Sequence, residues 1–297
     1  MLGYFLALVT MFIYGMYPVV SHYLVSDIDP IFLIGIVSIV ASIPFLLYLI
    51  PRNKQKDLFS IRFRKLFIEI ALLAAAANAL FFIGTKMTSG LNTSLLLQVE
   101  PIYSVILAFI FLGEKIKKRE ILSIIVMVIG AVVVAYKGGQ GLNIGDIFII
   151  ITPLLYQAYH MRAKQIMTQG GSANMVAAGR LLYGGIILLF IALVVHPESI
   201  LILTNVTKVW KMLLFGLLLS LNFFTWYQAV KLMPLSRASA FIPLSVSVSF
   251  LGSVFLLKEM PTSQHYVGLI LILIGLIGLT WIHFKREKTQ NTYEPEI

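Results

Sequence analysis

Two halves of the chain, residues 3–137 and 145–284, repeat one pattern of five apolar runs, each about 20 residues long. Shifting the sequence by about 145 positions aligns identical residues of the two halves. The aligned pairs are Glu114 with Glu259, Gly130 with Gly275, Lys86 with Lys231 and Ser94 with Ser239. A unit with an odd number of membrane crossings enters the bilayer from opposite sides in its two copies. The duplication therefore predicts two inverted repeats with a working site at their interface, a pattern typical of transporters.

Composition places the chain in a membrane. Hydrophobic residues make up 59% and charged residues 12% of the 297 positions, against roughly 25% charged residues in soluble domains. A soluble core of this size does not bury so much apolar surface, so the lipid bilayer is the expected partner. The net charge of +10 does not indicate nucleic acid, because the basic residues lie in short loops between apolar runs. The absence of cysteine excludes disulfides and thiolate metal sites.

The apolar runs predict an all-α membrane protein with ten transmembrane helices in two inverted five-helix repeats. The predicted helices cover residues 3–24, 30–51, 66–87, 91–112, 118–137, 145–167, 174–195, 208–230, 236–258 and 263–284. The segment 285–297 is polar, carries charges of both signs and contains a proline. We expect it to be a disordered cytoplasmic tail.

The distribution of basic residues predicts the orientation. Of the 23 lysines and arginines, 17 lie in one alternating set of loops or in the tail and five in the opposite set, with Arg180 inside a span. Cytoplasmic loops are enriched in Lys and Arg. We therefore expect a multi-pass protein of the plasma (inner) membrane with both termini in the cytoplasm.

Glu100 lies near the middle of the fourth predicted span, where a charged side chain costs about 2.5–3.5 kcal/mol. Pro101 follows it directly, removes one backbone hydrogen bond and predicts a local kink. One interpretation is a proton or cation relay, or a partner for a cationic group of the substrate. The other is a protonated side chain that joins two helices. Gln98 projects from a different face, about 200° away, and is expected to link helices.

Tyrosines form a second set of candidates. Tyr14 and Tyr17 lie three positions apart on one face of the first span, and Tyr156 and Tyr159 repeat this spacing in the sixth. The two pairs could line a cavity and bind planar or cationic solutes through stacking and hydroxyl groups. Helix packing with locally satisfied hydroxyls is the alternative.

Other polar groups lie within predicted spans. Asn78 and Asn222 occupy nearly equivalent positions in the two halves, and Trp226 lies one turn from Asn222. These three side chains could also line the cavity, although buried amides usually join neighbouring helices. Arg180 lies about 9 Å into the seventh span and is expected to extend to the cytoplasmic surface, with gating or anion contact as the alternative.

Two further features predict structural roles. Glu114 and Glu259 each end an apolar run, and we expect each to cap the following helix and pair with a nearby lysine. Glycines in the fifth and tenth spans allow close helix approach. They are Gly130, Gly268, Gly275 and Gly278. They could serve packing within one chain or a homodimer.

Motifs of several enzyme and motor classes are absent from the sequence. The chain has no phosphate-binding GxxxxGK[ST] loop, no HExxH motif and no GxSxG elbow, and its five histidines are scattered. We therefore expect no enzymatic activity, no cofactor and no metal site.

Each half resembles one EamA domain of the drug/metabolite transporter superfamily. The resemblance lies in residues 82–94 with Glu100-Pro101 and Leu112-Gly113-Glu114, and in residues 227–236 with Leu257-Lys258-Glu259. It implies ten helices, inverted repeats, a central cavity and export of small metabolites, including aromatic amino acids in some members. The chain departs from the pattern at Tyr14-Gly15, where relatives usually have Trp-Gly, and Glu100-Pro101 has no counterpart in the second half.

These observations favour a secondary transporter that exports a small organic metabolite by alternating access, with the solute bound near the midplane. Glu100 is the candidate for proton coupling. Pro18, Pro101, Pro153 and Pro243 are candidate flex points. An uncoupled facilitator or channel is the main alternative, and a membrane enzyme or scaffold acting on lipid is a third.

Overall fold

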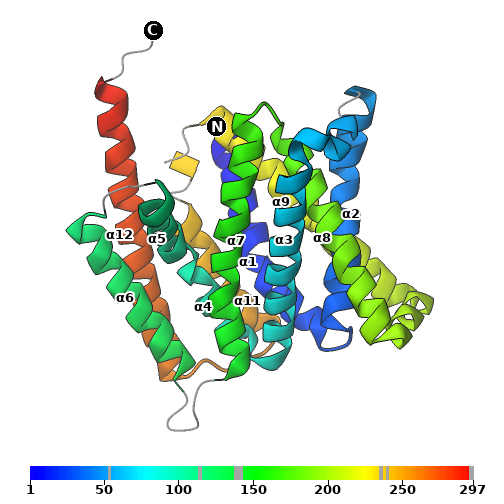
Figure 1. Ribbon diagram of the computed structural model, residues 1–297. Helices are drawn as coiled ribbons and strands as arrows, with labels where there is room; N and C mark the ends of the chain where they lie inside the picture. Colours follow the sequence, from blue (N-terminus) through cyan, green and yellow to red (C-terminus); the bar gives the residue numbers. More distant parts are fainter. Residues whose placement is uncertain (53–54, 113–115, 137–142, 234–236, 239–240, 294–297) are drawn as a thin grey trace. The chain divides into compact units, whose positions relative to one another are not determined.

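A computed structural model describes residues 1–52, 55–112, 116–136, 143–233, 237–238 and 241–293 (Figure 1). These residues form helices and contain no strand. The α-helices are α1 Leu2–Val25, α2 Pro30–Leu49, α3 Ile61–Met87, α4 Gly90–Leu96, α5 Glu100–Leu112, α6 Lys118–Ala135, α7 Ile144–Thr168, α8 Ala173–Val195, α9 Val206–Leu232, α11 Ile242–Phe255 and α12 Ser263–Tyr293. Short 3-10 helices are η1 Ile50–Arg52, η2 Gln55–Phe59, η3 Leu97–Val99 and η4 Pro197–Thr204.

The chain is an all-α membrane protein. Among the described residues, seven helical stretches are long and apolar enough to cross a bilayer, and α11 is a shorter apolar helix. The seven are 2–25, 30–52, 61–87, 90–111, 173–195, 206–232 and 263–282. Helices α6 and α7 occupy the fifth and sixth predicted ranges. The fourth predicted range is divided into α4, η3 and α5.

Local sequence explains where several helices begin and end. Asp29 precedes α2 and accepts a 2.8 Å hydrogen bond from the Phe32 N–H, with Pro30 at the first helical position. Ser89 and Ser172 cap α4 and α8 in the same way. Helix α7 ends at Thr168, and the turn after it includes Gly170, whose φ of +92° lies in the left-handed region that glycine adopts without strain.

The helices divide into two compact units, each of which includes segments of both sequence halves. Unit 1 contains residues 1–19, 89–146 and 222–297, and unit 2 contains residues 20–88 and 147–221. Helices α1 and α9 each contribute residues to both units. The compact units therefore do not coincide with the predicted halves 3–137 and 145–284.

In unit 1, α6 lies beside α12 (Figure 1), and glycines lie at their contact. An added Cβ at Gly130 would lie 3.0 Å from the side chain of Leu271, and one at Gly275 would lie 2.6 Å from the backbone oxygen of Ser123. Close packing of this kind drives helix association where lipid removes the usual hydrophobic driving force. Gly130 and Gly275 thus take part in packing within one chain, which is one of the two roles that the sequence predicts for them.

In unit 2, α2 packs against α8, also through glycines. Added Cβ atoms at Gly35 and Gly185 would lie 2.9 Å from the backbone nitrogen of Leu189 and 3.0 Å from the Ser38 side chain. Helix α9 joins α2 through the Ser220 hydroxyl, which donates a 2.6 Å hydrogen bond to the Ala41 carbonyl. Small residues and buried hydroxyls therefore hold this unit together.

Three helix pairs join equivalent positions of the two sequence halves, and in each the helices run antiparallel. They are α2 with α8, α6 with α12, and α4 with α11. In the last pair Gly90 lies near Glu259 and Ser94 lies near Ser253, so the numbering runs in opposite directions. The same reversal appears along α6 and α12, where Gly130 faces Leu271 and Ser123 faces Gly275.

The region after residue 284 differs from the prediction. Helix α12 continues to Tyr293, where the sequence predicts a disordered tail from residue 285. Lys, Arg, Glu and Gln in this stretch favour helix, and extending an existing helix avoids the cost of nucleation. Residues 294–297 lie outside the described residues.

Candidate solute-contact residues in each unit

The fourth predicted span is interrupted at Glu100. Helix α4 passes into the 3-10 turn η3, and α5 begins at Glu100. Proline at position 101 has no N–H to donate, so the chain tightens into this turn before the new helix starts. The predicted interruption beside Pro101 is therefore present, and Glu100 lies in the first turn of α5.

The Glu100 carboxylate contacts Tyr14. The Tyr14 hydroxyl donates a 2.8 Å hydrogen bond to Oε2 of Glu100, and both side chains are half-buried. Tyr17, one turn further along α1, is also half-buried. Gln98 is buried and donates to the Ser94 carbonyl of its own segment. Unit 1 thus holds a carboxylate and a phenol together within helices that the sequence predicts to be membrane-embedded.

Asn222 and Trp226 lie on the part of α9 that belongs to unit 1. The Asn222 amide donates a 2.9 Å hydrogen bond to the Thr10 carbonyl, and the Thr10 hydroxyl donates to the Thr225 hydroxyl at 2.8 Å. Trp226 packs against the cluster of Ala7, Ala229, Met233 and Ala238. The hydrogen bond of Asn222 joins α9 to α1, and joining helices is the role that the sequence analysis gives as the alternative to solute binding.

Unit 2 places Tyr156, Tyr159 and Arg180 together. The two tyrosine rings lie 5.7 Å apart between centroids. The Arg180 guanidinium donates a 3.0 Å hydrogen bond to the Tyr159 hydroxyl, and its carbon lies 4.9 Å from the centroid of that ring. Asn78, on α3, is half-buried. Arg180 therefore belongs to the same cluster as Tyr156 and Tyr159. The sequence indicates only that Arg180 lies within a span and does not indicate this partner.

Glu259 has a different partner from the one predicted. Its two carboxylate oxygens accept 2.7 Å hydrogen bonds from the backbone N–H groups of Gly90 and Leu91, so it caps α4 and not the following helix, α12. The preceding Lys258 has a φ of 57°, in the left-handed region that non-glycine residues seldom adopt. The matching prediction for Glu114 concerns a residue outside the described ones.

A polar network near this cap was not predicted. His265 Nδ1 accepts the Thr262 N–H at 3.0 Å, and its Nε2 lies 3.0 Å from Oδ1 of Asn92. The amide of Asn92 donates a 3.0 Å hydrogen bond to the fully buried Asp146. A backbone N–H can only donate, so Nδ1 must be the acceptor and Nε2 carries the proton. The network joins the start of α4 to the starts of α7 and α12.

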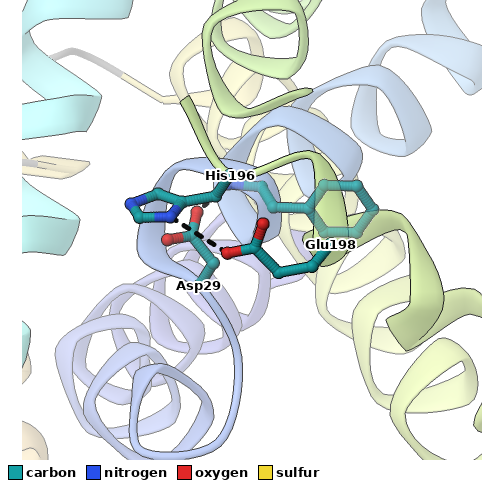
Figure 2. Close-up of polar contacts among 4 residues, drawn as sticks. Asp29, His196 and Glu198 are labelled. Atoms are coloured by element: carbon teal, nitrogen blue, oxygen red, sulfur yellow. Dashed lines mark hydrogen bonds and ion pairs between the residues drawn. The ribbon is translucent and has the colours of Figure 1, made fainter. Parts of the chain in front are cut away.

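An exposed pair lies in the connection between α8 and α9. Nδ1 of His196 lies 3.2 Å from the Glu198 carboxylate, and a dashed line marks this contact in Figure 2. The backbone N–H of Glu198 and the His196 side chain hold the pKa of the Glu198 carboxyl below its usual range. Among the described residues, no cluster of three His, Cys, Asp or Glu side chains could hold a metal ion.

Comparison with known proteins gives matches over both halves. The EamA-like transporter family model matches residues 1–136 and 143–281. An uncharacterized transporter of Bacillus subtilis, YyaM, is 26% identical over 210 residues, which cover 67% of each chain. A probable terminal-alkyne amino-acid exporter of Streptantibioticus cattleyicolor is 27% identical over 67% of this chain and 64% of its own.

The matched part of this chain thus covers about two thirds of the length of each of these relatives. One solved crystal structure shares the fold, with a TM-score of 0.67 at 13% identity. This superposition covers 94% of the present chain and 96% of the other.

Proposed function

Because the chain belongs to the EamA-like transporter family, we propose that it is a secondary transporter that exports a small organic metabolite by alternating access. The observation that carries the coupling part of this proposal is the hydrogen bond from Tyr14 to Glu100. The carboxylate in this bond is titratable and lies at a helix interruption within a predicted span. Ionisable residues in such positions commonly mark proton or ion pathways.

The Tyr14–Glu100 contact suits a group that gains and loses a proton. An ionised Glu100 accepts a 2.8 Å hydrogen bond from the Tyr14 hydroxyl. A protonated Glu100 becomes a donor, and the Tyr14 oxygen can accept from it without a change of partner. Protonation from outside and release inside would drive a solute in the opposite direction. Glu100 is accordingly the proposed coupling residue.

Alternating access requires two arrangements of the helices around a bound solute. We propose that the chain contains ten spans in two inverted repeats and that both termini lie in the cytoplasm. The antiparallel packing of α2 with α8, α4 with α11, and α6 with α12 supports inverted repeats. Proline positions where such helices could flex are Pro18, Pro101, Pro153 and Pro243.

We propose that residues of each unit contact the solute during transport. These candidates form two separate sets, Tyr14, Tyr17, Glu100 and Trp226 within unit 1, and Asn78, Tyr156 and Tyr159 within unit 2. Asn222 is assigned to joining α1 and α9, given its bond to Thr10. Aromatic and phenolic side chains favour an amino acid or another aromatic or amphipathic solute. The amino-acid exporter among the relatives supports this class.

Transport by purified protein in proteoliposomes tests the proposal. In the wild type we expect a pH gradient to drive accumulation of a labelled amino acid against its own gradient. In Glu100→Gln we expect loss of this concentrative step with retention of solute exchange, because the amide does not titrate. Glu198→Gln, which alters an exposed carboxylate in a connection between helices, is the matched control and should transport normally.

Two results would contradict the coupling mechanism. A Glu100→Gln protein that keeps full pH-driven flux would remove Glu100 from the coupling. Wild-type flux that never exceeds equilibration, and that is insensitive to collapse of the ion gradients, would identify an uncoupled facilitator.

A further inference from the structure

The connection between α8 and α9 lies at a bilayer surface and exposes apolar side chains. Both helices belong to the stretches that are long and apolar enough to cross a bilayer, so residues 196–205 join them at one surface. Ile200 and Leu201 of η4 are 49% and 65% exposed, and Val206 at the start of α9 is 68% exposed. Neighbouring exposed apolar residues mark a surface that contacts another apolar phase. These side chains therefore suit the boundary between lipid headgroups and acyl chains.

Two exposed aromatic rings accompany this connection in unit 2. Trp210 lies four positions after the start of α9, or about 6 Å along its axis, and is 59% exposed. Tyr23 lies near the end of α1 and is 49% exposed. Trp and Tyr are enriched where a membrane meets water, because each joins an apolar ring to a polar group. The start of α9 and the end of α1 thus have the side chains of a headgroup region.

Two lysines of α9 are held at this level by the end of α1 and the turn after it. Lys208 and Lys211 lie three positions apart and therefore on one face of the helix. Nζ of Lys208 donates a 2.9 Å hydrogen bond to the Asp27 carbonyl oxygen. Nζ of Lys211 donates a 2.9 Å hydrogen bond to the Tyr23 hydroxyl and lies 4.6 Å from the centroid of that ring. These contacts, all within unit 2, keep the two ammonium groups near each other.

The contacts leave both positive charges uncompensated. A carbonyl and a hydroxyl oxygen are neutral acceptors, and each uses one of the three donors of an ammonium group. Among the residues that the structure describes, no carboxylate oxygen lies within 4.0 Å of Nζ of Lys208 or Lys211. The acidic groups at this surface have other partners: Asp29 caps α2, and Glu198 pairs with His196 (Figure 2). The two lysines thus offer charge and N–H donors to an anion at the depth of the headgroups.

We propose that Lys208 and Lys211 bind the phosphate of an anionic phospholipid, with its acyl chains against the apolar side chains of η4. A zwitterionic headgroup carries its own cation, whereas an anionic headgroup brings the net negative charge that two ammonium groups attract. Lysine stems lie along apolar surface while their charged ends remain at the interface, which suits this position. The proposal does not depend on the transported solute, its coupling or its direction.

Quenching of Trp210 fluorescence by brominated lipid tests the proposal in full-length protein. Trp226→Phe and Trp281→Phe leave Trp210 as the only tryptophan. The protein is reconstituted in phosphatidylcholine vesicles with about 20% phosphatidylglycerol, an anionic lipid, and bromine is placed on this lipid or on an equal fraction of the phosphatidylcholine. We expect phosphatidylglycerol to be preferred about 5- to 25-fold beside Trp210, because each lysine near an anionic headgroup contributes about fivefold.

Two matched double substitutions separate this site from general surface charge. Lys208→Gln with Lys211→Gln should abolish the preference for the brominated anionic lipid. Lys56→Gln with Lys164→Gln removes the same charge from two exposed lysines and should retain the preference. Lys56 follows α2 in η2, so the length of α2, about 30 Å, separates it from the turn that contains Asp27.

Several results would overturn the lipid site. Equal quenching of the wild type by the two brominated lipids would refute it, and so would an equal loss of preference in both double variants. Displacement of the brominated anionic lipid by inorganic phosphate would identify a site for free phosphate instead. If the Lys208→Gln, Lys211→Gln protein does not fold, each single substitution should lower the preference about fivefold. An unchanged preference in either single variant would then exclude that lysine and refute the paired site.

Discussion

Replacing Glu259 by alanine should destabilise the protein, because this side chain caps α4 from a distant part of the chain. Its carboxylate accepts the N–H groups of Gly90 and Leu91 at 2.7 Å each. The Ser89 hydroxyl accepts a different N–H group, that of Asn92. Without Glu259, two backbone donors at the start of α4 lose their acceptor, and the negative charge that favours a helix N-terminus is lost as well.

The expected cost follows from these two bonds. A hydrogen bond to a charged group contributes about 1.5–3 kcal/mol, so the pair has an upper limit of about 3–6 kcal/mol. Glu259 is half-buried, and water can replace part of what is lost. We therefore expect Glu259→Ala to lower the free energy of unfolding by about 2–4 kcal/mol. Glu259→Gln retains one carbonyl acceptor and should lose about half of that amount.

Thermal unfolding of purified protein in detergent measures the effect. The estimated loss corresponds to a drop in Tm of about 5–10 °C for a chain of this size. Glu198→Ala is the matched control, because that carboxylate is exposed and its partner, His196, lies in the same connection between helices. Its Tm should stay within about 1 °C of the wild type. A Glu259→Ala protein that melts with the wild type would refute the assignment of Glu259 as the cap of α4.

Two other predictions concern packing and pH. Gly275→Ala should cost about 1–3 kcal/mol in thermal unfolding, because its Cβ would lie 2.6 Å from the backbone oxygen of Ser123, whereas Gly184→Ala, with 3.6 Å to its nearest neighbour, should be neutral. Equal melting of the two variants would contradict this. The lowered pKa of Glu198 means that its ionised form favours the folded state above the usual carboxyl range, and that this contribution is lost as the pH falls through the folded-state value. His196→Ala should raise the Glu198 titration midpoint in a carbon NMR titration, and an unchanged midpoint would exclude that contact as a cause.

Much of the helical organisation could be predicted because the bilayer imposes it. A long apolar run must form a helix in lipid, so most predicted ranges agree with observed helices to within a few residues. The interruption at Glu100 was predictable from Pro101 alone, since a missing N–H acts locally. The helix beyond residue 284 does not follow from the polar, mixed-charge composition of this stretch, which is typical of disorder, although the individual residues favour helix.

Contacts between distant segments were not predictable from the same signals. Glu259 recurs at the repeat position of Glu114, which indicated a cap but not that the capped helix would be α4. His265 and Asn92 carry no local pattern, and only the fold brings them together with Asp146. Arg180 contacts Tyr159 of α7 at 3.0 Å, and its position within a span does not by itself indicate this partner.

The packing of three helices against their counterparts from the other half has a consequence for how the protein is made. Helices α2, α4 and α6 leave the ribosome before α8, α11 and α12, the helices on which they pack, have been synthesised. During that interval their small-residue faces meet lipid, and each early helix must persist in the bilayer through its own hydrophobicity. The packing of α6 is therefore completed only when the last third of the polypeptide has been made, and a ribosome that stops before α12 releases a chain in which α6 lacks its packing partner.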